Sequence, residues 1–521
     1  MACCCWRQNR HRRGSMADRN LMQGNRRIIE RIVVNGELVL ETPAHFGGDD
    51  APGFVDMALA RDPLSGDALL PGASIAGALR SYLRTRLEGY GVEEPRHKHR
   101  DDELALLFGY QHDDDGAQSS LLTTDARSRL PALELRDGVA INPVTRTADD
   151  KKKFNIELLP AGTIFDLRIE LLVRASAPAE DTHDDRTLRM VTAFAQALQG
   201  FERGEIPMGA RKRRGFGKCR VKSWQVKRYD LRQPDGLLAW LSHDVHGAPT
   251  AQGAGPSIAP LLGVADQAEP DKRARFTLTA TFGLESSLLI RSGGDEAGQP
   301  DMVHLQSLRG GKSVPIVSGT SLAGALRARA LRIAKTVGVA TQAEQFIVNL
   351  FGSQERASRV WLAETEIDNP IERVVTRLKI DRFTGGAYPN ALFSQQPVFA
   401  GKDTQVTMTL KVDNPRDADI GLILLLLKDL WTGDLAVGGE ASVGRGRLYG
   451  KSAELTLFSG ADNLPGGNEQ ANAPGTGRSV QTVQSWTLQR ATDGGLLLPE
   501  NADELQSFVD AFLKEVQHVE A

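Results

Sequence analysis

Shortages of cysteine, of long apolar runs and of net charge each exclude a class of protein. Only four of the 521 residues are cysteine, and three of these are adjacent at positions 3–5. Adjacent cysteines suit neither a disulfide framework nor the spaced ligand pairs of a zinc site. The apolar run at residues 421–427 stops at Lys428, far short of the ~20 residues that a membrane span needs. A formal charge of -3 excludes a generic polyanion binder, so any nucleic-acid surface must be a local patch.

The N-terminal segment, residues 1–26, is predicted to be a disordered leader. It is rich in arginine and lacks the apolar stretch of a signal peptide. Met16 is an alternative start to Met1. The remaining cysteine, Cys219, lies in a strand pattern and is predicted to be a small core residue. This cysteine usage indicates a reducing compartment, which we take to be the cytoplasm, and no membrane partner.

One ten-residue motif occurs twice. PGASIAGALR at residues 71–80 returns as SGTSLAGALR at residues 318–327. The flanking landmarks return in the same order: GGD at 47–49 and 293–295, DM at 56–57 and 301–302, LFG at 107–109 and 350–352, and glycine-rich loops at 209–217 and 438–446. Solenoid repeats recur every ~20–50 residues, so a single long period predicts two copies of a whole domain.

The repeat divides the chain into two domains of roughly 200 residues, each long enough to bury its own core. A Gly/Pro/Ala-rich stretch between them is predicted to be a linker, and residues 459–484 are predicted to be disordered. A short C-terminal helix is predicted near residues 501–517. The predicted boundaries are 1–26 for the leader, 27–228 for the first domain, 229–273 for the linker, 274–458 for the second domain and 459–521 for a flexible tail.

Hydrophobic periodicity predicts the same order of elements in both domains: strand, helix, strand, strand, helix, strand. Alternation of apolar and polar residues marks the strands, and apolar residues three and four apart mark the helices. This order is the ferredoxin-like, α+β pattern, whose sheet serves other modules as a platform for single-stranded RNA. The main predicted elements are 32–40, 73–89, 165–173, 186–200 and 218–226 in the first domain, and 276–284, 320–336, 406–412, 419–431 and 447–457 in the second.

The first glycine-rich loop is the most charged stretch of the chain. Nine of the eighteen residues from Arg211 to Arg228 are Lys or Arg. Glycines allow backbone N–H groups to approach a phosphate while the cations neutralise it, and the ring of Phe216 is suited to stacking on a base. The alternative is a solvated basic face. The candidate RNA-binding residues are Gly209, Arg211, Lys212, Arg213, Arg214, Gly215, Phe216, Gly217 and Lys218 in the first loop, and Gly438, Gly439 and Arg445 in the second.

Together these motifs resemble the RAMP superfamily, the ferredoxin-like RNA-binding proteins of CRISPR systems. The resemblance covers residues 27–228 and 274–458 and is closest to the backbone subunits that line the guide RNA in type III effector complexes. It implies two tandem ferredoxin-like (RRM-like, βαββαβ) RAMP domains with thumb insertions and glycine-rich loops. A tandem fusion of this kind is similar to the double-backbone protein of subtype III-D-like complexes.

The resemblance also implies contacts with the guide RNA outside the loops. A serine and backbone amides at a helix start can hold a phosphate, although Ser74 and Ser321 are also candidate helix caps. The arginines could instead lie on a solvent face, and a lone histidine is more often structural. Thumbs are expected at residues 148–154 and 380–387. The implied contacts are Ser74, Arg80, Ser321, Arg327, His45, Gly47, Gly48, Arg291 and Arg382, with His45 and Arg291 at matching places before the two Gly-Gly pairs.

Asp56 and Asp301 are the candidate catalytic residues. Both precede a methionine, and both lie in the loop where cutting members of the family carry an aspartate. The resemblance implies metal-assisted transesterification of target RNA, a hydrolase-class antiviral activity that uses Mg²⁺ or another divalent ion. The alternative is that each is a surface or turn residue.

The implied partners are the guide RNA, the target RNA and other type III effector subunits, including the large signalling subunit. Three rival functions remain. The first is a scaffold that only binds guide RNA. The second is a polymerase or cyclase palm, suggested by GGDD at 47–50 and GGDE at 293–296. The third is a guide-processing nuclease that uses His45 as its base, which the second domain lacks.

Overall fold

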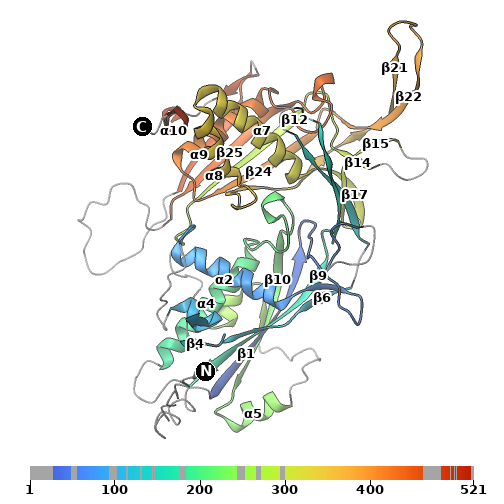
Figure 1. The fold of residues 1–521 in the computed structure, drawn as a ribbon. Coiled ribbons are helices and arrows are strands. Elements are labelled where there is room, and N and C mark those ends of the chain that lie inside the picture. The colour runs from blue at the N-terminus through green and yellow to red at the C-terminus, as the bar shows by residue number, and fades with distance from the viewer. Residues whose placement is uncertain are drawn as a thin grey trace, which may run out of the picture.

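The fold is described from a computed structural model of the chain, and two stacked lobes make up the molecule (Figure 1). Lobe 1 comprises the described residues up to 265, and lobe 2 those from 271 onward. Each lobe buries its own hydrophobic core. The residues described are 27–48, 55–92, 102–112, 115–129, 132–142, 145, 147–175, 183–242, 253–265, 271–293, 300–460, 483–492, 494–497, 499 and 501–517.

Lobe 1 contains a five-stranded sheet with the order β11-β10-β1-β9-β5, in which neighbouring strands are antiparallel. Alternate side chains of β1 and β9 face the helices; Ile32, Val34 and Ile169 are fully buried there. Helix α2 contributes Ile75 and Leu79 to the same core. The elements are β1 (Ile28–Leu40), β5 (Leu121–Thr123), β9 (Ile164–Arg174), β10 (Cys219–Asp230), β11 (Gly253–Gly255), α2 (Gly72–Glu88), α3 (Glu103–Phe108), α4 (His183–Glu202), α5 (Pro234–Leu241) and α6 (Ile258–Leu261).

Lobe 2 repeats this arrangement around a larger sheet with the order β16-β17-β19-β24-β12-β25-β26-β27, and β18 also pairs with β24. The strand β26 adds Trp486 to the lobe 2 core, and the helix α10 adds Phe508 and Phe512. The elements are β12 (Arg275–Leu284), β16 (Gln306–Arg309), β17 (Lys312–Val317), β18 (Val360–Leu362), β19 (Thr365–Asp368), β24 (Gln405–Asp413), β25 (Leu448–Phe458), β26 (Val483–Arg490), β27 (Leu496–Leu497), α7 (Gly319–Val337), α8 (Ala340–Phe351), α9 (Asp417–Trp431) and α10 (Ala502–Gln517).

Each lobe also carries a long hairpin, β7 (Glu134–Ile141) with β8 (Ala148–Leu158) and β21 (Val375–Ile380) with β22 (Ala387–Gln396). The second projects from lobe 2 (Figure 1). Residues 148–154 lie in β8, and residues 380–387 form the tip of the second hairpin. The shorter elements are β2 (Ala68–Leu70), β3 (Tyr110–His112), β4 (Asp115–Ala117), β6 (Ala126–Ser128), β13 (Ser287–Leu288), β14 (Arg291–Gly293), β15 (Met302–His304), β20 (Ile371–Glu372), β23 (Val398–Phe399) and the 3₁₀ turns η1 (Lys212–Arg214) and η2 (Ala441–Val443).

The mixed α/β composition and the main predicted helices and strands are confirmed, but the structure differs in the segments between and after the domains. The predicted linker contains α5, β11 and α6, and Ile258 of α6 is fully buried in the lobe 1 core. The predicted flexible tail adds β26 to the lobe 2 sheet, and α10 buries Phe508 and Phe512. Elements as short as α6 and β11 contain too few residues to show a period. Residues 1–26 and 461–482 lie outside the described residues.

Among the described residues, no helix combines the length and the apolar composition that crossing a membrane requires.

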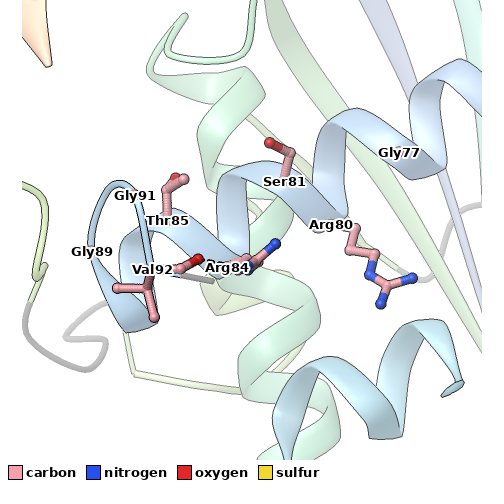
Figure 2. A pocket seen from close by; sticks show the side chains of 8 residues that line it. All are labelled: Gly77, Arg80, Ser81, Arg84, Thr85, Gly89, Gly91 and Val92. Carbon is pink, nitrogen blue, oxygen red and sulfur yellow. Dashed lines mark hydrogen bonds between the residues drawn. The ribbon is translucent and has the colours of Figure 1, made fainter. Parts of the chain in front are cut away.

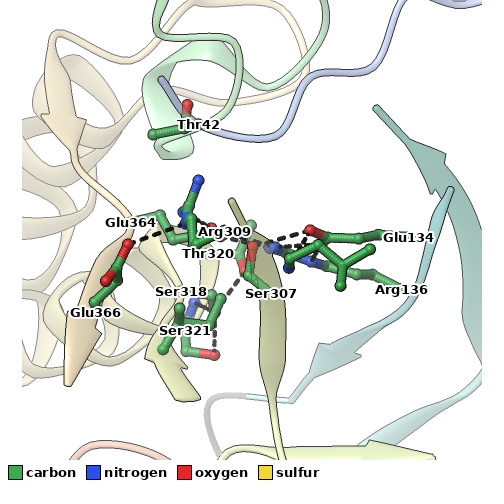
Figure 3. Close-up of polar contacts among 12 residues, drawn as sticks. Thr42, Glu134, Arg136, Ser307, Arg309, Ser318, Thr320, Ser321, Glu364 and Glu366 are labelled. Atoms are coloured by element: carbon green, nitrogen blue, oxygen red, sulfur yellow. Dashed lines mark hydrogen bonds and ion pairs between the residues drawn. The ribbon is translucent and has the colours of Figure 1, made fainter. Parts of the chain in front are cut away.

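A buried ionic cluster joins the two lobes (Figure 3). Arg136 of β7 lies between Glu134, at 2.7 Å, and Glu364 of lobe 2, to which it is also ion-paired. Glu364 in turn accepts a hydrogen bond of 2.7 Å from Arg309, while Glu134 accepts one of 2.6 Å from the backbone N–H of Leu308. The side chain of Glu364 is 0% exposed, so its charge depends entirely on these partners.

The loop that carries η1 forms the other half of this contact. Arg213 is ion-paired with Asp413, and its guanidinium lies 4.2 Å from the ring centroid of Trp361. The indole of Trp361 donates a 2.6 Å hydrogen bond to the same Asp413. The backbone of Arg214 lies so close to Gly319, the first residue of α7, that a side chain there would clash. We call this contact and the ionic cluster together the joint.

Candidate nucleic-acid interface and catalytic aspartates

The two glycine-rich loops share one backbone frame. Gly209 and Gly438 both have left-handed φ angles, 88° and 84°, and a Cβ at either would strike a backbone carbonyl. The next residue in each loop donates a backbone hydrogen bond to that carbonyl: Ala210 to His45 at 2.9 Å, and Gly439 to Leu289 at 2.8 Å. The internal repeat therefore extends to the conformation of the loops.

This frame corrects the prediction for His45. Its structural counterpart is Leu289, and Arg291 instead matches Gly47. His45 is 2% exposed, and its Nδ1 lies 2.9 Å from the carbonyl oxygen of Glu157. The imidazole therefore packs inside lobe 1 and does not face a phosphate. Gly47 and Gly48 remain exposed beside it.

In the first loop, Arg211, Lys212 and Arg214 lie close to other cations. Burial, and then the guanidinium of Arg214, lower the pKa of Arg211; burial and Arg213 do the same for Lys212. Burial and Arg327 of α7 lower the pKa of Arg214. Crowded cations repel one another, so a polyanion placed here would relieve the repulsion. Arg214 and Arg327, predicted as contacts in different domains, are thus neighbours across the joint.

Two residues of this loop serve the fold instead of a ligand. Phe216 is 4% exposed and packs against Ile156 and Leu158 of β8. Its ring therefore has no face for a base, and the predicted stacking is wrong. Arg213 is committed to Asp413 in the joint. Gly217 is buried below the loop, and Lys218 pairs with Glu41 at 2.7 Å while its side chain stays 52% exposed.

Phe216→Ala is expected to lower the free energy of unfolding by about 3 kcal/mol, because it leaves a cavity beside Ile156 and Leu158. Phe216→Leu refills most of that space and should retain RNA affinity. Denaturant unfolding and RNA titration of both variants check this. A Phe216→Leu variant with native stability but weakened RNA binding would restore the stacking role.

The second loop differs in charge from the first. Glu440 takes the place of Arg211, both with left-handed φ, and Arg445 takes the place of Phe216. Arg445, predicted to contact RNA, is 3% exposed and donates a 2.9 Å hydrogen bond to Gln395, so its side chain lies inside lobe 2. Burial opposes ionisation of Glu440, but Gln395, Arg445 and Arg377 outweigh it and lower the pKa of this carboxyl. Arg291 pairs with Glu440 at 3.2 Å.

Neither Ser74 nor Ser321, the two serines predicted to contact RNA at the helix starts, caps its helix. Helix α2 begins after Pro71 without a side-chain cap, and Ser74 is exposed in its first turn. Helix α7 is capped by Ser318, whose Oγ accepts the N–H of Ser321 at 3.3 Å and donates to the Ser321 hydroxyl at 2.9 Å (Figure 3). The capping alternative is thereby excluded for both Ser74 and Ser321.

The helix arginines are partly occupied by the fold. Arg327 donates to the carbonyl of Gly352, at the end of α8, at 2.8 Å. Arg80 is half-buried and lines a cavity of about 250 Å³ along α2 with Ser81, Arg84 and Thr85 (Figure 2).

The tip of the β21–β22 hairpin is exposed and partly apolar. Arg382 lies there beside Phe383, whose side chain is 100% exposed. Asp381 shapes the turn by accepting backbone hydrogen bonds from Phe383 at 2.7 Å and Thr384 at 3.1 Å. An exposed ring and a cation at a hairpin tip suit contact with nucleic-acid bases and phosphates.

Asp56 and Asp301 occupy equivalent places. The carboxylate of Asp56 accepts the backbone N–H of Asn155 at 2.8 Å, and that of Asp301 accepts the N–H of Ser394 at 2.7 Å. Each aspartate also donates its own N–H to the side chain of the same partner, at 2.6 Å and 3.1 Å. Both carboxylates are exposed. Each lobe thus holds one acid at the base strand of its hairpin.

Comparison with known proteins places this geometry in a family. A model of the RAMP superfamily matches residues 37–220 and 281–449, one stretch in each lobe. The chain belongs to the RAMP superfamily. Its relatives include a protein named CRISPR system Cms endoribonuclease Csm3 from Streptococcus thermophilus, 24% identical over 223 residues that cover 40% of this chain and 96% of the relative. A protein of the same name from Mycobacterium tuberculosis (strain ATCC 25618 / H37Rv) is 26% identical over 233 residues, 41% of this chain and 96% of the relative.

Few side chains around Asp56 and Asp301 could serve as ligands to a metal ion. Among the described residues, no group of three or more His, Cys, Asp or Glu side chains is placed to hold one. Each aspartate offers a single carboxylate, one oxygen of which already accepts a backbone N–H. Mg²⁺ is commonly bound through one or two carboxylates plus substrate phosphates and water. Each aspartate could therefore supply only one protein ligand to such an ion.

If Asp301 takes part in RNA cleavage, Ser394→Ala is expected to shift the acid limb of that cleavage to higher pH. Hydrogen bonds from the backbone N–H and the hydroxyl of Ser394 lower the pKa of Asp301. Removing the hydroxyl raises that pKa, so the carboxylate protonates, and activity falls, at a higher pH than in the wild type. A pH–rate profile measures this, and the cut made by lobe 1 in the same complexes is the internal control. An unmoved acid limb would show that Asp301 does not act as a carboxylate.

Asn155 and Ser394 are the site residues that the sequence did not reveal. They lie 99 and 93 residues from the aspartates they hold. Neither belongs to a repeated motif, because one lobe uses an amide where the other uses a hydroxyl. Only the hairpin register identifies them as equivalents.

Proposed function

We propose that this chain is a guide-RNA-binding backbone subunit of a type III CRISPR ribonucleoprotein that cleaves complementary target RNA. The observation that carries the proposal is that an exposed aspartate is held at the base of a hairpin in each lobe with matching hydrogen bonds. The names of the two relatives support an endoribonuclease. The partners would be the guide RNA, the target RNA and other type III subunits, including the large signalling subunit.

We also propose that each lobe has the ferredoxin-like fold and that its long hairpin is a thumb. The strand order β10-β1-β9-β5, with α2 and α4 as the connecting helices, supports the ferredoxin-like fold. The hairpins β7–β8 and β21–β22 support the assignment of thumbs, because each follows the second core strand of its lobe and ends in exposed side chains. The exposed ring of Phe383 would enter the guide–target duplex.

The chemistry proposed is transesterification within the target strand. The 2′-oxygen attacks the adjacent phosphorus and the bond to the 5′-oxygen breaks; the products are a 2′,3′-cyclic phosphate and a 5′-hydroxyl, to which the proton passes. Asp56 or Asp301 would orient the 2′-hydroxyl through its free carboxylate oxygen. A bound divalent ion would supply neutralisation of the phosphate charge. The cations of the first loop hold the guide strand in register with the acid.

A non-catalytic scaffold is the second candidate. One observation favours it: each carboxylate already accepts a backbone N–H at 2.7–2.8 Å, as a purely structural aspartate would. Guide binding does not distinguish the two candidates, whereas cleavage does.

Replacing Arg211, Lys212 and Arg214 together with alanine tests RNA binding. The plot of log K against log[salt] for single-stranded RNA should become shallower by about 2, because three phosphate contacts each contribute roughly 0.7. Lys514→Ala, an exposed cation on α10, is the control and should leave the slope unchanged. An unchanged slope in the triple variant would remove the first loop from the RNA interface.

A further inference from the structure

Asp56 and Asp301 have different neighbours on the hairpins that hold them. Successive side chains of a strand point to opposite faces, so Lys153 and Asn155 of β8 lie on one face of the first hairpin. Asp137 of β7 is the cross-strand partner of Asn155 and shares that face. Lys153 and Asp137 form an ion pair there, with Nζ 2.9 Å from the carboxylate oxygen. An ammonium group therefore lies beside the residue that holds Asp56.

The spacing of these groups suits a phosphodiester. Two residues of a strand span roughly 7 Å, which is the distance along β8 from Asn155 to Lys153. A phosphorus atom with its attacking and leaving oxygens, and a hydrogen bond of about 3 Å to each, is slightly longer than this. The flexible lysine side chain covers the difference. In an in-line reaction the two oxygens lie on opposite sides of phosphorus, so a group that orients one and a group that protonates the other must be this far apart.

The side chain of Lys153 is accessible to a substrate. It is 68% exposed, and that of its partner Asp137 is 33% exposed. An exposed ion pair contributes little to stability, so the fold does not depend on this one. The alternative, an ordinary surface ion pair, predicts no effect on cleavage and is one outcome of the test below.

A second cation beside this face is Arg61. It pairs with Glu157 at 3.4 Å, and Glu157 lies two residues beyond Asn155 in the direction away from Lys153. A guanidinium keeps its proton at any ordinary pH, whereas an ammonium group can release one. Of the two cations, only the lysine is suited to giving a proton.

Lobe 2 has no charge at the matching places. Ser394 pairs with Thr376 across the second hairpin, so Thr376 takes the place of Asp137. Two residues before Ser394, Leu392 takes the place of Lys153, and it is 67% exposed. The ammonium group and the carboxylate that holds it are thus replaced together.

The cations along β21 are engaged elsewhere. Arg377 follows Thr376 and therefore points to the opposite face of the strand, where it pairs with Glu440 at 3.4 Å. Nζ of Lys379 lies 4.4 Å from the ring centroid of Tyr388. The sequence of β22, the strand that holds the lobe 2 aspartate, contains no Lys or Arg. The two lobes therefore differ in whether an ammonium group lies beside the acid.

We propose that Lys153 is the general acid of the lobe 1 cut, an inference that rests on the function proposed above. As the bond between phosphorus and the 5′-oxygen breaks, the ammonium group gives its proton to that oxygen and a 5′-hydroxyl leaves. The 2′-hydroxyl loses its proton to water as its oxygen bonds to phosphorus, and the neutral amine regains a proton from solvent. Asp137 positions the ammonium group. In lobe 2 the leaving oxygen takes its proton from water.

A target RNA with sulfur in place of the 5′-oxygen at the lobe 1 cut tests this role. A thiolate, whose thiol has a pKa of about 8.5, leaves without a proton, unlike an alkoxide. In assembled guide complexes, Lys153→Leu should slow the lobe 1 cut of ordinary RNA by at least about 10²-fold, yet cut the sulfur substrate within about tenfold of the wild-type rate. Lys152→Leu is the matched control, because Lys152 is the 62% exposed neighbour on the opposite face, and it should cut both substrates like the wild type.

Two results overturn the proposal. Equal slowing of both substrates by Lys153→Leu would make this lysine a phosphate contact, and unchanged rates would make it a surface residue. Asp56→Asn distinguishes failure of this inference from failure of the proposed function, because it should slow the cut of both substrates. If Asp56→Asn cuts like the wild type, lobe 1 is not the nuclease. If only Lys153→Leu cuts like the wild type, the assignment of the acid alone fails.

The wild-type complex provides a second measurement. Sulfur at the lobe 2 cut should accelerate cleavage at least about tenfold more than sulfur at the lobe 1 cut, because lobe 2 has no general acid at the place of Lys153. Single-turnover rates of the two cuts measure both gains in the same complex. Equal gains at the two cuts would show that lobe 1 has no acid that lobe 2 lacks, and would overturn the proposal.

Discussion

Effector complexes that carry Asp301→Asn are expected to lose one cut in the target RNA, by at least about 10²-fold, while target binding persists. Asparagine preserves the shape of the side chain and can still accept the N–H of Ser394, so only the negative charge is removed. The proposed role of Asp301 requires that charge beside the 2′-hydroxyl. Cleavage of guide-paired RNA in Mg²⁺, resolved at single-nucleotide length, measures the loss.

Asp56→Asn should remove a different cut, because Asp56 occupies the same place in lobe 1. Asp503→Asn, an exposed aspartate in the first turn of α10, is the matched control and should cut like the wild type. If the Asp56→Asn/Asp301→Asn double variant also cuts like the wild type, the chain is a scaffold and another subunit performs the scission.

Glu364→Gln is expected to destabilise the contact between the lobes by about 3–5 kcal/mol. The change removes the buried carboxylate that Arg136 and Arg309 share, so Arg136 keeps only Glu134 and Arg309 keeps only the exposed Glu366 to offset their desolvation. Because the joint couples the lobes, we expect the urea transition to move to lower concentration and to separate into two steps.

Glu366→Gln provides a control on the same arginine. Glu366 pairs with Arg309 at 3.4 Å, but its side chain is 52% exposed. An exposed ion pair contributes about 0–1 kcal/mol, so this variant should unfold almost as the wild type does. Equal losses in the two variants would mean that burial of Glu364 is not what makes its charge matter.

Local signals in the sequence predicted the elements that the two lobes share. The repeated motif at residues 71–80 and 318–327 lies at the start of α2 and α7, where helical periodicity is strong. The equivalence of Asp56 and Asp301, suggested by the methionine after each, is confirmed by their matching hydrogen bonds to Asn155 and Ser394. These predictions depend on neighbours in the chain, which the sequence displays.

The failures involve contacts between distant segments. Phe216 looked like an exposed ring in a basic loop, but β8, some sixty residues earlier, covers it. Arg213 looked like another RNA-binding cation, but Asp413 of the other lobe pairs with it. His45 was aligned with Arg291 by counting from the glycines, whereas the backbone hydrogen bonds align it with Leu289. None of these partners can be identified from local composition or periodicity.

Hydrogen bonds in both directions between each aspartate and its hairpin couple the position of the carboxylate to the position of the hairpin. Asp301 both gives a hydrogen bond to Ser394 and receives two from it, so the β21–β22 strand pair cannot tilt without carrying the carboxylate along. A mispaired nucleotide beneath the hairpin would therefore displace the acid before it dislodged the strand. Such a mismatch should slow scission at that lobe before it weakens binding of the duplex.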